Sequence, residues 1–512
     1  MTNLVRKIFT NTISQIFGKV VTALLGVLAI KMLTNYLSVT EYGQYTTIYQ
    51  YLSYFGIIAD LGLYTIAIRE MTKHPDQEEK IFGNIYGLRL LLTIASLLVA
   101  VVVAFVIPQY QNSYIPLGVA IASITTMLAL MNGTIVSILQ VRLEMNKSTI
   151  STILGKIINV AVMAACIYVI YPKDPNATAI SYQAFMAILY VGIIANIVQL
   201  ALSHWYSSQY LRVKLRFEWD FWKELLKKTL PYGLALFLST VYLKIDVVML
   251  GLIRSQSEVG IYGVATKALE VINVLPLFFL NSLLPVLSRY VDERDERLKQ
   301  LIKYAFDFLL ILATPIFFSV LVLSYPIVSL LASPDFLSGP ALQAKFGFFY
   351  GSDVVLMILS LALSFSFINN LFSYILVSIN RQSQLMWVNG GCVVFNVLLN
   401  IYAITNYGLI GAAVTTVLSE IFVITFGFYY ARKYMKEEGL PFHITFESTL
   451  KIVLSGAIMA GVIFTLNPFI LGVLKAKGAI LSLAIGGIVY VAFLFLFKVL
   501  TPSMLKKVLL RG

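Results

Sequence analysis

Long apolar segments dominate this chain and restrict it to one fold class. Fourteen stretches of predominantly apolar residues follow one another, separated by short polar connectors. A stretch of ~20 apolar residues is long enough to cross the ~30 Å hydrocarbon core of a bilayer. In that core only helices and closed barrels satisfy the backbone, and the stretches lack the period-two alternation of barrel strands. The sequence therefore predicts an all-α polytopic membrane protein.

The predicted spans form a group of six, a second group of six and a final pair. Their approximate bounds are 8–37, 44–70, 82–107, 114–141, 148–171, 181–206, 229–253, 260–288, 304–332, 347–378, 384–404, 409–431, 449–467 and 479–500. We expect an N-terminal six-helix lobe at 1–206, a cytoplasmic interfacial linker at 207–228 and a C-terminal six-helix lobe at 229–435. Two additional spans and a basic tail occupy 436–512.

The distribution of charge supports this assignment and orients the chain. Only 12% of the 512 residues are charged, against ~25% in soluble domains. With both termini inside, the cytoplasmic segments hold 27 Lys and Arg residues and the opposite loops five. Such an excess predicts a cytoplasmic-membrane protein with both termini cytoplasmic. The net charge of +13 does not indicate nucleic acid, because the basic residues form no contiguous run.

A short repeat suggests that the two lobes are related. The pattern Glu-x-Gly-x-Tyr occurs at 41–45 and again at 258–262, each time after the first span of its group. Both copies are interpreted as polar turns between two spans. The linker residues 217–228 carry aromatic and leucine side chains on one side and lysines on the other. This favours a helix lying in the headgroup region, with a solvated linker as the alternative.

Charged residues inside the predicted spans are the candidate functional residues. The basic ones are Lys19, Lys31, Arg89, Lys156, Lys244 and Lys267, and the acidic ones are Asp60, Asp246, Glu270 and, nearer a helix end, Asp307. Each costs several kcal/mol if it faces lipid, so such residues usually face a bundle interior or a wet cavity. Lys31 and Arg89 could instead reach a helix end, and Lys267 and Glu270, three residues apart, could pair with each other.

The excess of cations over anions indicates an anionic substrate, such as one that carries phosphate. Buried asparagines, including Asn369, Asn396 and Asn400, are expected to form interhelical hydrogen bonds. The sequence lacks the usual catalytic motifs of metalloproteases, nucleotide hydrolases and serine hydrolases. Cys166 and Cys392 lack metal-site spacing. We expect no enzyme activity, no metal and no cofactor.

Several motifs resemble those of a known family. They are Asn396–Asn400, Tyr407–Ala413 and Thr415–Glu420, then Ser38–Tyr45 with Asp60–Leu63 and Arg69–Glu70, then Lys244–Asp246 with Gly260–Tyr262, and Leu284–Pro285 with Ser288–Arg289. In order and extent the chain resembles the polysaccharide branch of the multidrug/oligosaccharidyl-lipid/polysaccharide flippase superfamily. It is similar to Wzx-type O-antigen flippases.

The resemblance implies two pseudo-symmetric lobes around a central cavity, alternating access and a lipid-diphosphate-linked oligosaccharide as cargo. Lys19, Lys31, Lys244 and Lys267 would then face the cavity and neutralise the diphosphate, with Arg89 and Lys156 as further substrate-binding candidates. The acids Asp60, Asp246 and Glu270 would couple an ion or hold the lysines. Membrane lipids are expected partners, and a glycan polymerase or glycosyltransferases are candidate ones. A monomer suffices, since one chain supplies both lobes.

Three alternatives remain open. A cation-coupled small-molecule or multidrug antiporter of the same fold would use Asp60 or Glu270 as its coupling site. A glycan polymerase or ligase would be expected to carry a large extracytoplasmic catalytic loop, and the loops here are short. A scaffold without transport is the third.

Overall fold

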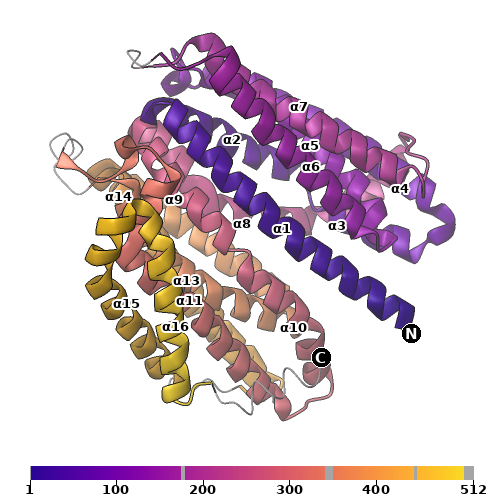
Figure 1. The fold of residues 1–512 in the computed structure, drawn as a ribbon. Coiled ribbons are helices and arrows are strands. Elements are labelled where there is room, and N and C mark those ends of the chain that lie inside the picture. Colours follow the sequence, from indigo (N-terminus) through magenta and orange to yellow (C-terminus); the bar gives the residue numbers. More distant parts are fainter. Residues whose placement is uncertain (1, 175–178, 341–349, 443–446, 501–512) are drawn as a thin grey trace. The chain divides into compact units, whose positions relative to one another are not determined.

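The structure is a computed structural model of the chain, in which residues 2–174, 179–340, 350–442 and 447–500 are described. Helices make up most of these ranges, and no β-strand occurs within them. The prediction of an all-α protein is therefore confirmed. By packing, the chain divides into two compact units, Met1–Gly260 and Ile261–Gly512, whose helices are coloured along the sequence in Figure 1.

The first unit is a bundle built around α5. Its helices are α1 (Thr2–Tyr36), α2 (Val39–Asp60), α3 (Leu63–Lys73), α4 (Glu78–Val106), α5 (Ile115–Val141), α6 (Met145–Ala165), α7 (Tyr182–Ser207), α8 (Trp219–Ile253) and the start of α9 (Gln256–Ile272). Helix α5 packs against α2, α3, α4 and α7, while α1 packs along α6 and α8 along α2. Helix α8 packs in this unit, and the predicted lobes at 1–206 and 229–435 stay a prediction.

The second unit is organised around α13. Besides the rest of α9 it contains α10 (Leu275–Asp292), α11 (Arg297–Leu331), α13 (Ser352–Ser378), α14 (Gln382–Glu437), α15 (Glu447–Leu474) and α16 (Gly478–Leu496). Helix α13 packs against α10, α11 and α14, and α15 and α16 pack against each other and α11. Two helices meet within α14 at Gly408, whose φ of 55° and ψ of −135° are not helical. Glycine adopts this conformation at little cost, so the chain changes direction between the predicted eleventh and twelfth spans.

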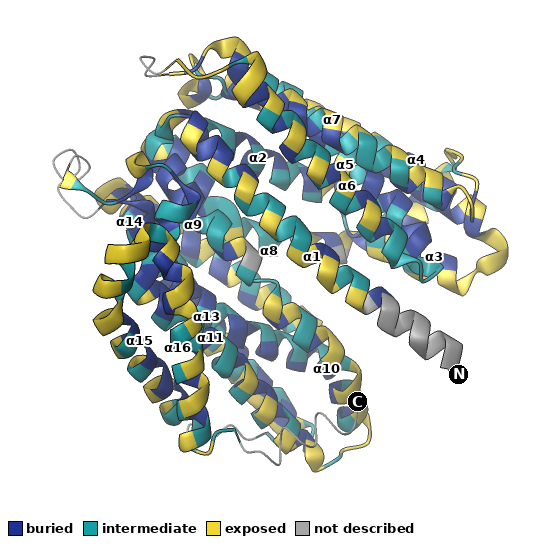
Figure 2. Cartoon of the chain, in the orientation of Figure 1, coloured by how far each residue is buried: buried dark blue, intermediate teal, exposed yellow. Residues whose placement is uncertain are grey.

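Twelve stretches of the described chain are long and apolar enough to cross a membrane. Two of them, Gln382–Glu437 and Glu447–Leu496, are 56 and 50 residues long, and each contains two of the predicted spans. Many residues of the long helices are exposed (Figure 2). Large apolar side chains are among them, such as Val102 of α4 at 62%, which suits contact with lipid. The protein is a multi-pass membrane protein, and the number of fourteen spans stays a prediction.

The Glu-x-Gly-x-Tyr copies lie in helices, which corrects their interpretation as turns. At the start of α2, Ser38 Oγ accepts a hydrogen bond from Glu41 N at 3.3 Å, and Glu41 Oε2 accepts one from Ser38 N at 2.8 Å. This capping box satisfies two backbone donors in the first turn. In the second copy, Ser255 Oγ accepts from Glu258 N at 3.3 Å. Each copy marks the start of a helix. The interpretation as turns overlooked the sequence signal for a helix start, which is the serine three residues before each glutamate.

Gly43 and Gly260, the central residues of the two copies, lie against each other. A Cβ atom on Gly43 would lie 3.0 Å from the Gly260 nitrogen and would collide with the carbonyl oxygen of Gln256. Helices can cross this closely only where a small residue leaves room for the facing backbone. Thr47 of α2 also donates a hydrogen bond to Gln256 Oε1 at 2.6 Å. The repeat therefore provides a tight crossing of α2 and the start of α9 within the first unit.

Gly43→Ala is expected to lower the free energy of unfolding by about 1–3 kcal/mol, the usual cost of overpacking, because the colliding atom belongs to backbone. Thermal unfolding of the detergent-purified protein would measure this. Gly26→Ala is the matched control, since no atom lies within 4 Å of its Cβ position. That control should be neutral or stabilising by ~0.5–1 kcal/mol. Equal melting temperatures for the two variants would contradict the close crossing.

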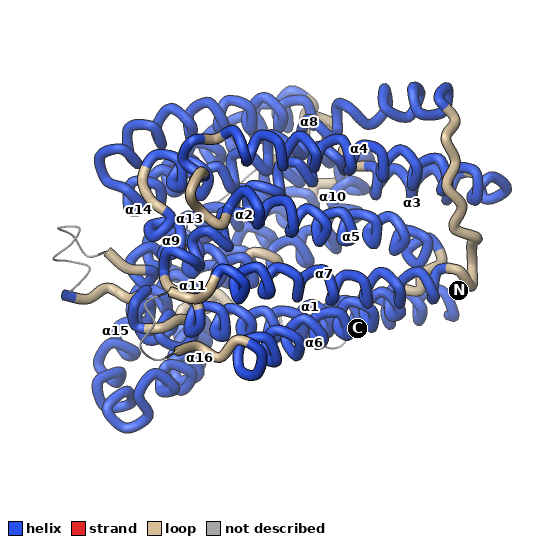
Figure 3. The backbone as a smooth tube through the Cα atoms, turned by 90° about the horizontal axis from the view of Figure 1, so that it is seen from above, coloured by secondary structure: helices blue, strands red, loops and turns tan. Residues whose placement is uncertain are grey.

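Residues 219–228 are helical, but they form the start of α8 and not a separate helix. A position of this segment in the headgroup region stays a prediction. The chain is irregular from 212 to 218 (a loop in Figure 3), and α8 then runs unbroken from Trp219. Arg216 N donates a hydrogen bond to the carbonyl oxygen of Gly83 on α4 at 3.1 Å. Trp222 is 6% exposed, and its indole N–H donates to the carbonyl oxygen of Asn84 at 2.9 Å. The aromatic residues thus hold the linker and α8 against α4.

Glu218 secures the end of this segment. Its carboxylate forms an ion pair with Lys80 at 2.9 Å, and its backbone N–H donates to Asn84 Oδ1 at 2.9 Å. The carboxylate of Glu218 also accepts side-chain hydrogen bonds from Lys80 and Asn84, and these two, with that from Lys80 the larger, lower the pKa of Glu218 below its ordinary value. A carboxyl with a lowered folded-state pKa stabilises the fold above its unfolded pKa, ~4.3 for Glu. That contribution is lost as the pH falls through the folded-state pKa.

We expect acidification below about pH 4.3 to loosen the linker. Hydrogen exchange at residues 212–218, corrected for intrinsic rates, should show protection decreasing across that range. Glu218→Gln should be less protected at neutral pH and should lose most of the pH dependence. An unchanged pH profile in Glu218→Gln would show that another group controls the linker.

Candidate functional site

The second predicted span is interrupted, which corrects its description as one helix over 44–70. Helix α2 ends at Asp60, and Leu61 and Gly62 adopt left-handed conformations with φ of 42° and 74°. Such a conformation is strained for leucine. Gly233 of α8 packs on the break, since its Cβ position lies 2.9 Å from Leu61 Cα. The break places the Asp60 carboxylate at a helix end.

Asp60 and Arg89 form an ion pair inside the first unit. Arg89 lies on α4, its side chain is 4% exposed, and its Nη1 also donates a hydrogen bond to Thr134 Oγ1 of α5 at 2.9 Å. Next to it, Tyr64 of α3 donates a hydrogen bond to Gln140 of α5. A lone charge at this depth is costly, and the pair with its hydrogen bond offsets that cost. Arg89 therefore joins α2, α4 and α5 instead of reaching for a helix end.

Lys267 and Glu270 also pair with each other. Their charged groups lie 2.8 Å apart along one face of α9, with side chains 37% and 45% exposed. This is the pair that the three-residue spacing predicts. The lysine charge is thus partly compensated within its own helix.

Lys19 and Lys31 of α1 differ from the charged residues above. Lys19 lies at the middle of a 35-residue helix, and both side chains are exposed. Neither makes an ion pair or a side-chain hydrogen bond with any residue in the described part of the chain. Both therefore differ from Arg89 and Lys267, whose charges are paired.

The remaining predicted residues are spread over the first unit. Lys156 of α6 and Lys244 of α8 are half-buried, and Asp246 of α8 is 2% exposed. The structure thus brings together Asp60 with Arg89 and Lys267 with Glu270. The central cavity that would bring the whole set together stays a prediction.

A buried polar network in the second unit was missing from the predicted site. Glu420 of α14 is 3% exposed, and the Asn369 side chain of α13 donates to its carboxylate and, at 3.1 Å, to its backbone oxygen. Asn396 donates to Ser419 Oγ at 3.0 Å across the two parts of α14, so the expected interhelical bonding is confirmed for Asn369 and Asn396. Asn400 donates to Asn396 Oδ1 at 2.9 Å within its own helix. The signal for Glu420 was its position near the middle of the span 409–431. Within the described ranges no three His, Cys, Asp or Glu residues are arranged as a metal site.

Two family models match the sequence. The model described as "Polysaccharide biosynthesis protein" matches residues 8–291, more than half of the chain. This chain belongs to that family. The MatE model matches residues 231–402. The resemblance stated from the sequence motifs is confirmed.

The relatives found by comparison include a glycan flippase and two transporter structures. "Probable low-salt glycan biosynthesis flippase Agl15" of Haloferax volcanii is 22% identical over 269 residues, which are 52% of this chain and 53% of that protein. The match thus spans about half the length of this curated relative. The lipid II flippase MurJ, in an inward closed conformation, has a TM-score of 0.69 at 16% identity, covering 98% of this chain and 100% of MurJ.

The second structure is an inward-facing multidrug resistance MATE family transporter of the MOP superfamily. Its TM-score is 0.63 at 14% identity, and the match covers 81% of this chain and 95% of that chain. At such identities the similarity shows a shared fold, while function must be argued from the site.

Arg89→Met is expected to destabilise the protein by about 3–5 kcal/mol, because it leaves the Asp60 carboxylate without its cation. The double variant Asp60→Asn with Arg89→Met removes both charges and should recover much of that loss. Thermal unfolding of the wild type, both single variants and the double variant forms a complete cycle. If the loss of unfolding free energy in the double variant equals the sum of the losses in the two single variants, the two residues are not coupled.

Proposed function

We propose that this protein is a flippase that moves a lipid-diphosphate-linked oligosaccharide across the cytoplasmic membrane by alternating access. Family membership supports a role in polysaccharide biosynthesis. Two of the relatives are named as flippases. No covalent chemistry is needed for this function, and the protein would act on its cargo by binding and reorientation.

The charge balance within the spans is the observation that carries the proposal. Two of the predicted acids, Asp60 and Glu270, lie in ion pairs with Arg89 and Lys267. The lysines of α1, Lys19 and Lys31, lack a partner in the described ranges. Since a charge at membrane depth is costly, these ammonium groups suit a function that supplies an anion. A diphosphate offers several acceptor oxygens to such donors.

The other charged residues support this role in different ways. Arg89 would position α4 against α2, leaving Lys19 and Lys31 as the leading diphosphate ligands. Lys156, Lys244 and Lys267 would extend the basic surface of the predicted cavity. Asp60, Asp246 and Glu270 would hold basic groups in place or couple the cycle to an ion. The cargo glycan, the driving ion and the topology with both termini inside belong to this proposal.

The alternative is a cation-coupled small-molecule antiporter. The MatE match over residues 231–402 and the multidrug transporter fold favour it. Such a protein would bind organic cations, and its interior lysines would be structural. The two functions therefore require ligands of opposite charge: the flippase binds an anionic diphosphate, and the antiporter binds an organic cation.

The proposal predicts that a short-chain polyprenyl-diphosphate sugar stabilises the protein in detergent. At 100 times its Kd, a ligand of the folded state adds about 2.7 kcal/mol, which thermal unfolding detects. Lys19→Gln with Lys31→Gln should weaken binding at least about tenfold, since each lost charge-assisted bond costs ~1.5–3 kcal/mol. Lys223→Gln with Lys227→Gln, on the exposed start of α8, removes the same charge and should bind normally.

The control ligands are the polyprenyl monophosphate and a panel of organic cations. Stabilisation that requires the diphosphate and is lost in the α1 variant supports the flippase. Stabilisation by organic cations alone, unchanged in the α1 variant, would overturn it in favour of the antiporter.

A further inference from the structure

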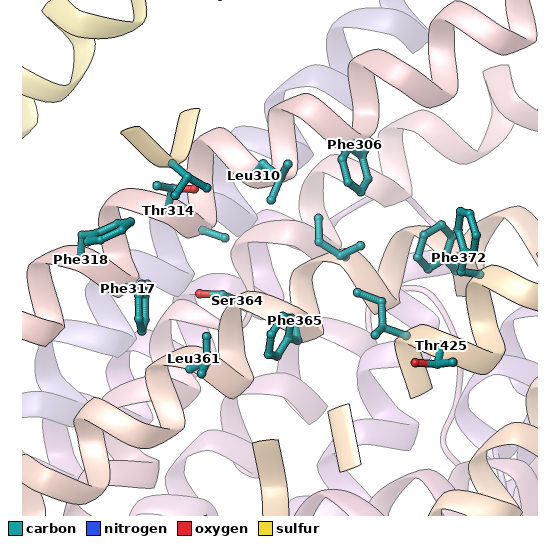
Figure 4. A pocket seen from close by; sticks show the side chains of 15 residues that line it. Phe306, Leu310, Thr314, Phe317, Phe318, Leu361, Ser364, Phe365, Phe372 and Thr425 are labelled. Carbon is teal, nitrogen blue, oxygen red and sulfur yellow. The ribbon is translucent and has the colours of Figure 1, made fainter. Parts of the chain in front are cut away.

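The second unit contains an apolar pocket that the charged site does not use. It has a volume of about 540 Å³ and lies between α11, α13, the second part of α14 and α15 (Figure 4). Six phenylalanines make up much of its wall: Phe306, Phe317, Phe318, Phe365, Phe372 and Phe428. No charged side chain of the described residues lines it. Its walls favour a hydrocarbon ligand.

The polar side chains in the wall already have partners in the protein, and two of them, Ser364 and Thr425, donate within their own helices, while Thr314 is hydrogen-bonded to Tyr490 of α16. Ser364 Oγ donates a hydrogen bond to the carbonyl oxygen of Ser360 at 3.0 Å. Thr425 Oγ1 donates to that of Ile421 at 2.7 Å. A ligand would gain little from hydrogen bonding here, so burial of apolar surface would supply its affinity.

The pocket lies beside the middle of α11, α13 and the second part of α14, and it reaches Val453 near the start of α15. The start of α11 and the ends of α13 and α14 meet in one apolar cluster that includes Ile302, Ile379 and Met435. Thr425 and Val453, which line the pocket, are exposed. Under the predicted topology α11 and α15 begin on the cytoplasmic side, so a hydrocarbon chain that passes Val453 would come from the cytoplasmic leaflet.

Basic residues lie close along the sequence to the lining at this end. Lys303 precedes Phe306 by three residues, Lys451 precedes Val453 by two, and Arg432 follows Phe428 by four. Each basic residue is therefore within about one helical turn of a residue that lines the pocket. Lys451 forms an ion pair with Glu447 at 3.1 Å on the exposed side of α15. A phosphate at this surface could accept a further hydrogen bond from the Lys451 ammonium group. Basic side chains near the cytoplasmic membrane surface attract anionic headgroups.

We propose that this pocket binds one acyl chain of an anionic phospholipid from the cytoplasmic leaflet, with its phosphate near Lys303, Lys451 and Arg432. The volume favours a single acyl chain over the longer polyprenyl chain of a glycan carrier. At the ~30 Å³ that a water molecule occupies in the liquid, the pocket holds about 18 groups of that size. The bound chain fills the space between α15 and α13, and so fixes the last two spans to the rest of their unit. This binding site is independent of the proposed transport.

The test is native mass spectrometry of the full-length protein with defined lipids. Phosphatidylglycerol is the probe, and phosphatidylcholine and a polyprenyl phosphate are the comparison lipids. We expect one phosphatidylglycerol to be retained at concentrations where phosphatidylcholine is lost. Lys303→Gln with Lys451→Gln should weaken retention roughly 10- to 30-fold, and Ser364→Phe, which fills the pocket, should abolish it.

Two controls separate this site from general effects. Val102→Phe adds similar apolar bulk on an exposed face of the first unit and should leave retention unchanged. The charge variants are expected to fold even if Ser364→Phe does not. Retention of phosphatidylglycerol unaffected by both sets of variants would overturn the proposal. Preferential retention of the polyprenyl phosphate would also overturn the proposal and assign the pocket to a carrier chain. Equal retention of phosphatidylcholine would overturn the proposed contact between the anionic headgroup and the basic residues.

Discussion

The need to satisfy every backbone hydrogen bond inside hydrocarbon governs this structure. Helices meet that need within a single segment, so the few places where a span breaks are informative. One break, at Leu61 and Gly62, is covered by the close approach of Gly233 and lies beside the Asp60–Arg89 pair. Broken helices next to charged groups are typical of transporter binding sites. Backbone geometry and charge thus meet at the same place in the first unit.

Compensation of buried charge is the second organising constraint. Arg89 is neutralised by Asp60 and hydrogen-bonded to Thr134, and each of these residues comes from a different helix. Glu420 receives the Asn369 amide in the second unit. These pairs fix which helices are neighbours, because apolar packing in a membrane does not by itself specify the neighbours of a helix. By contrast, Lys19 and Lys31 of α1 are exposed and form no ion pair with a residue in the described part of the chain.

The second unit contains a buried polar network and an apolar pocket between the same helices. Its Asn396–Ser419 and Asn369–Glu420 bonds hold α13 and the two parts of α14 together. The phenylalanine-lined pocket lies between these helices, α11 and α15. Hydrogen bonding within the network offsets the cost of burying its polar groups next to apolar side chains.

The sequence by itself determined the fold class, most span positions and which charges lie within spans, because length, hydropathy and charge are local properties of each segment. It also placed Lys267 and Glu270 on one helical face, since that pairing depends only on their spacing. Tertiary structure alone decided that Gly43 meets Gly260, that Trp222 seals the linker onto α4, and that Arg89 pairs with Asp60. These outcomes depend on which helices become neighbours, and residues far apart in the chain carry no local record of that choice.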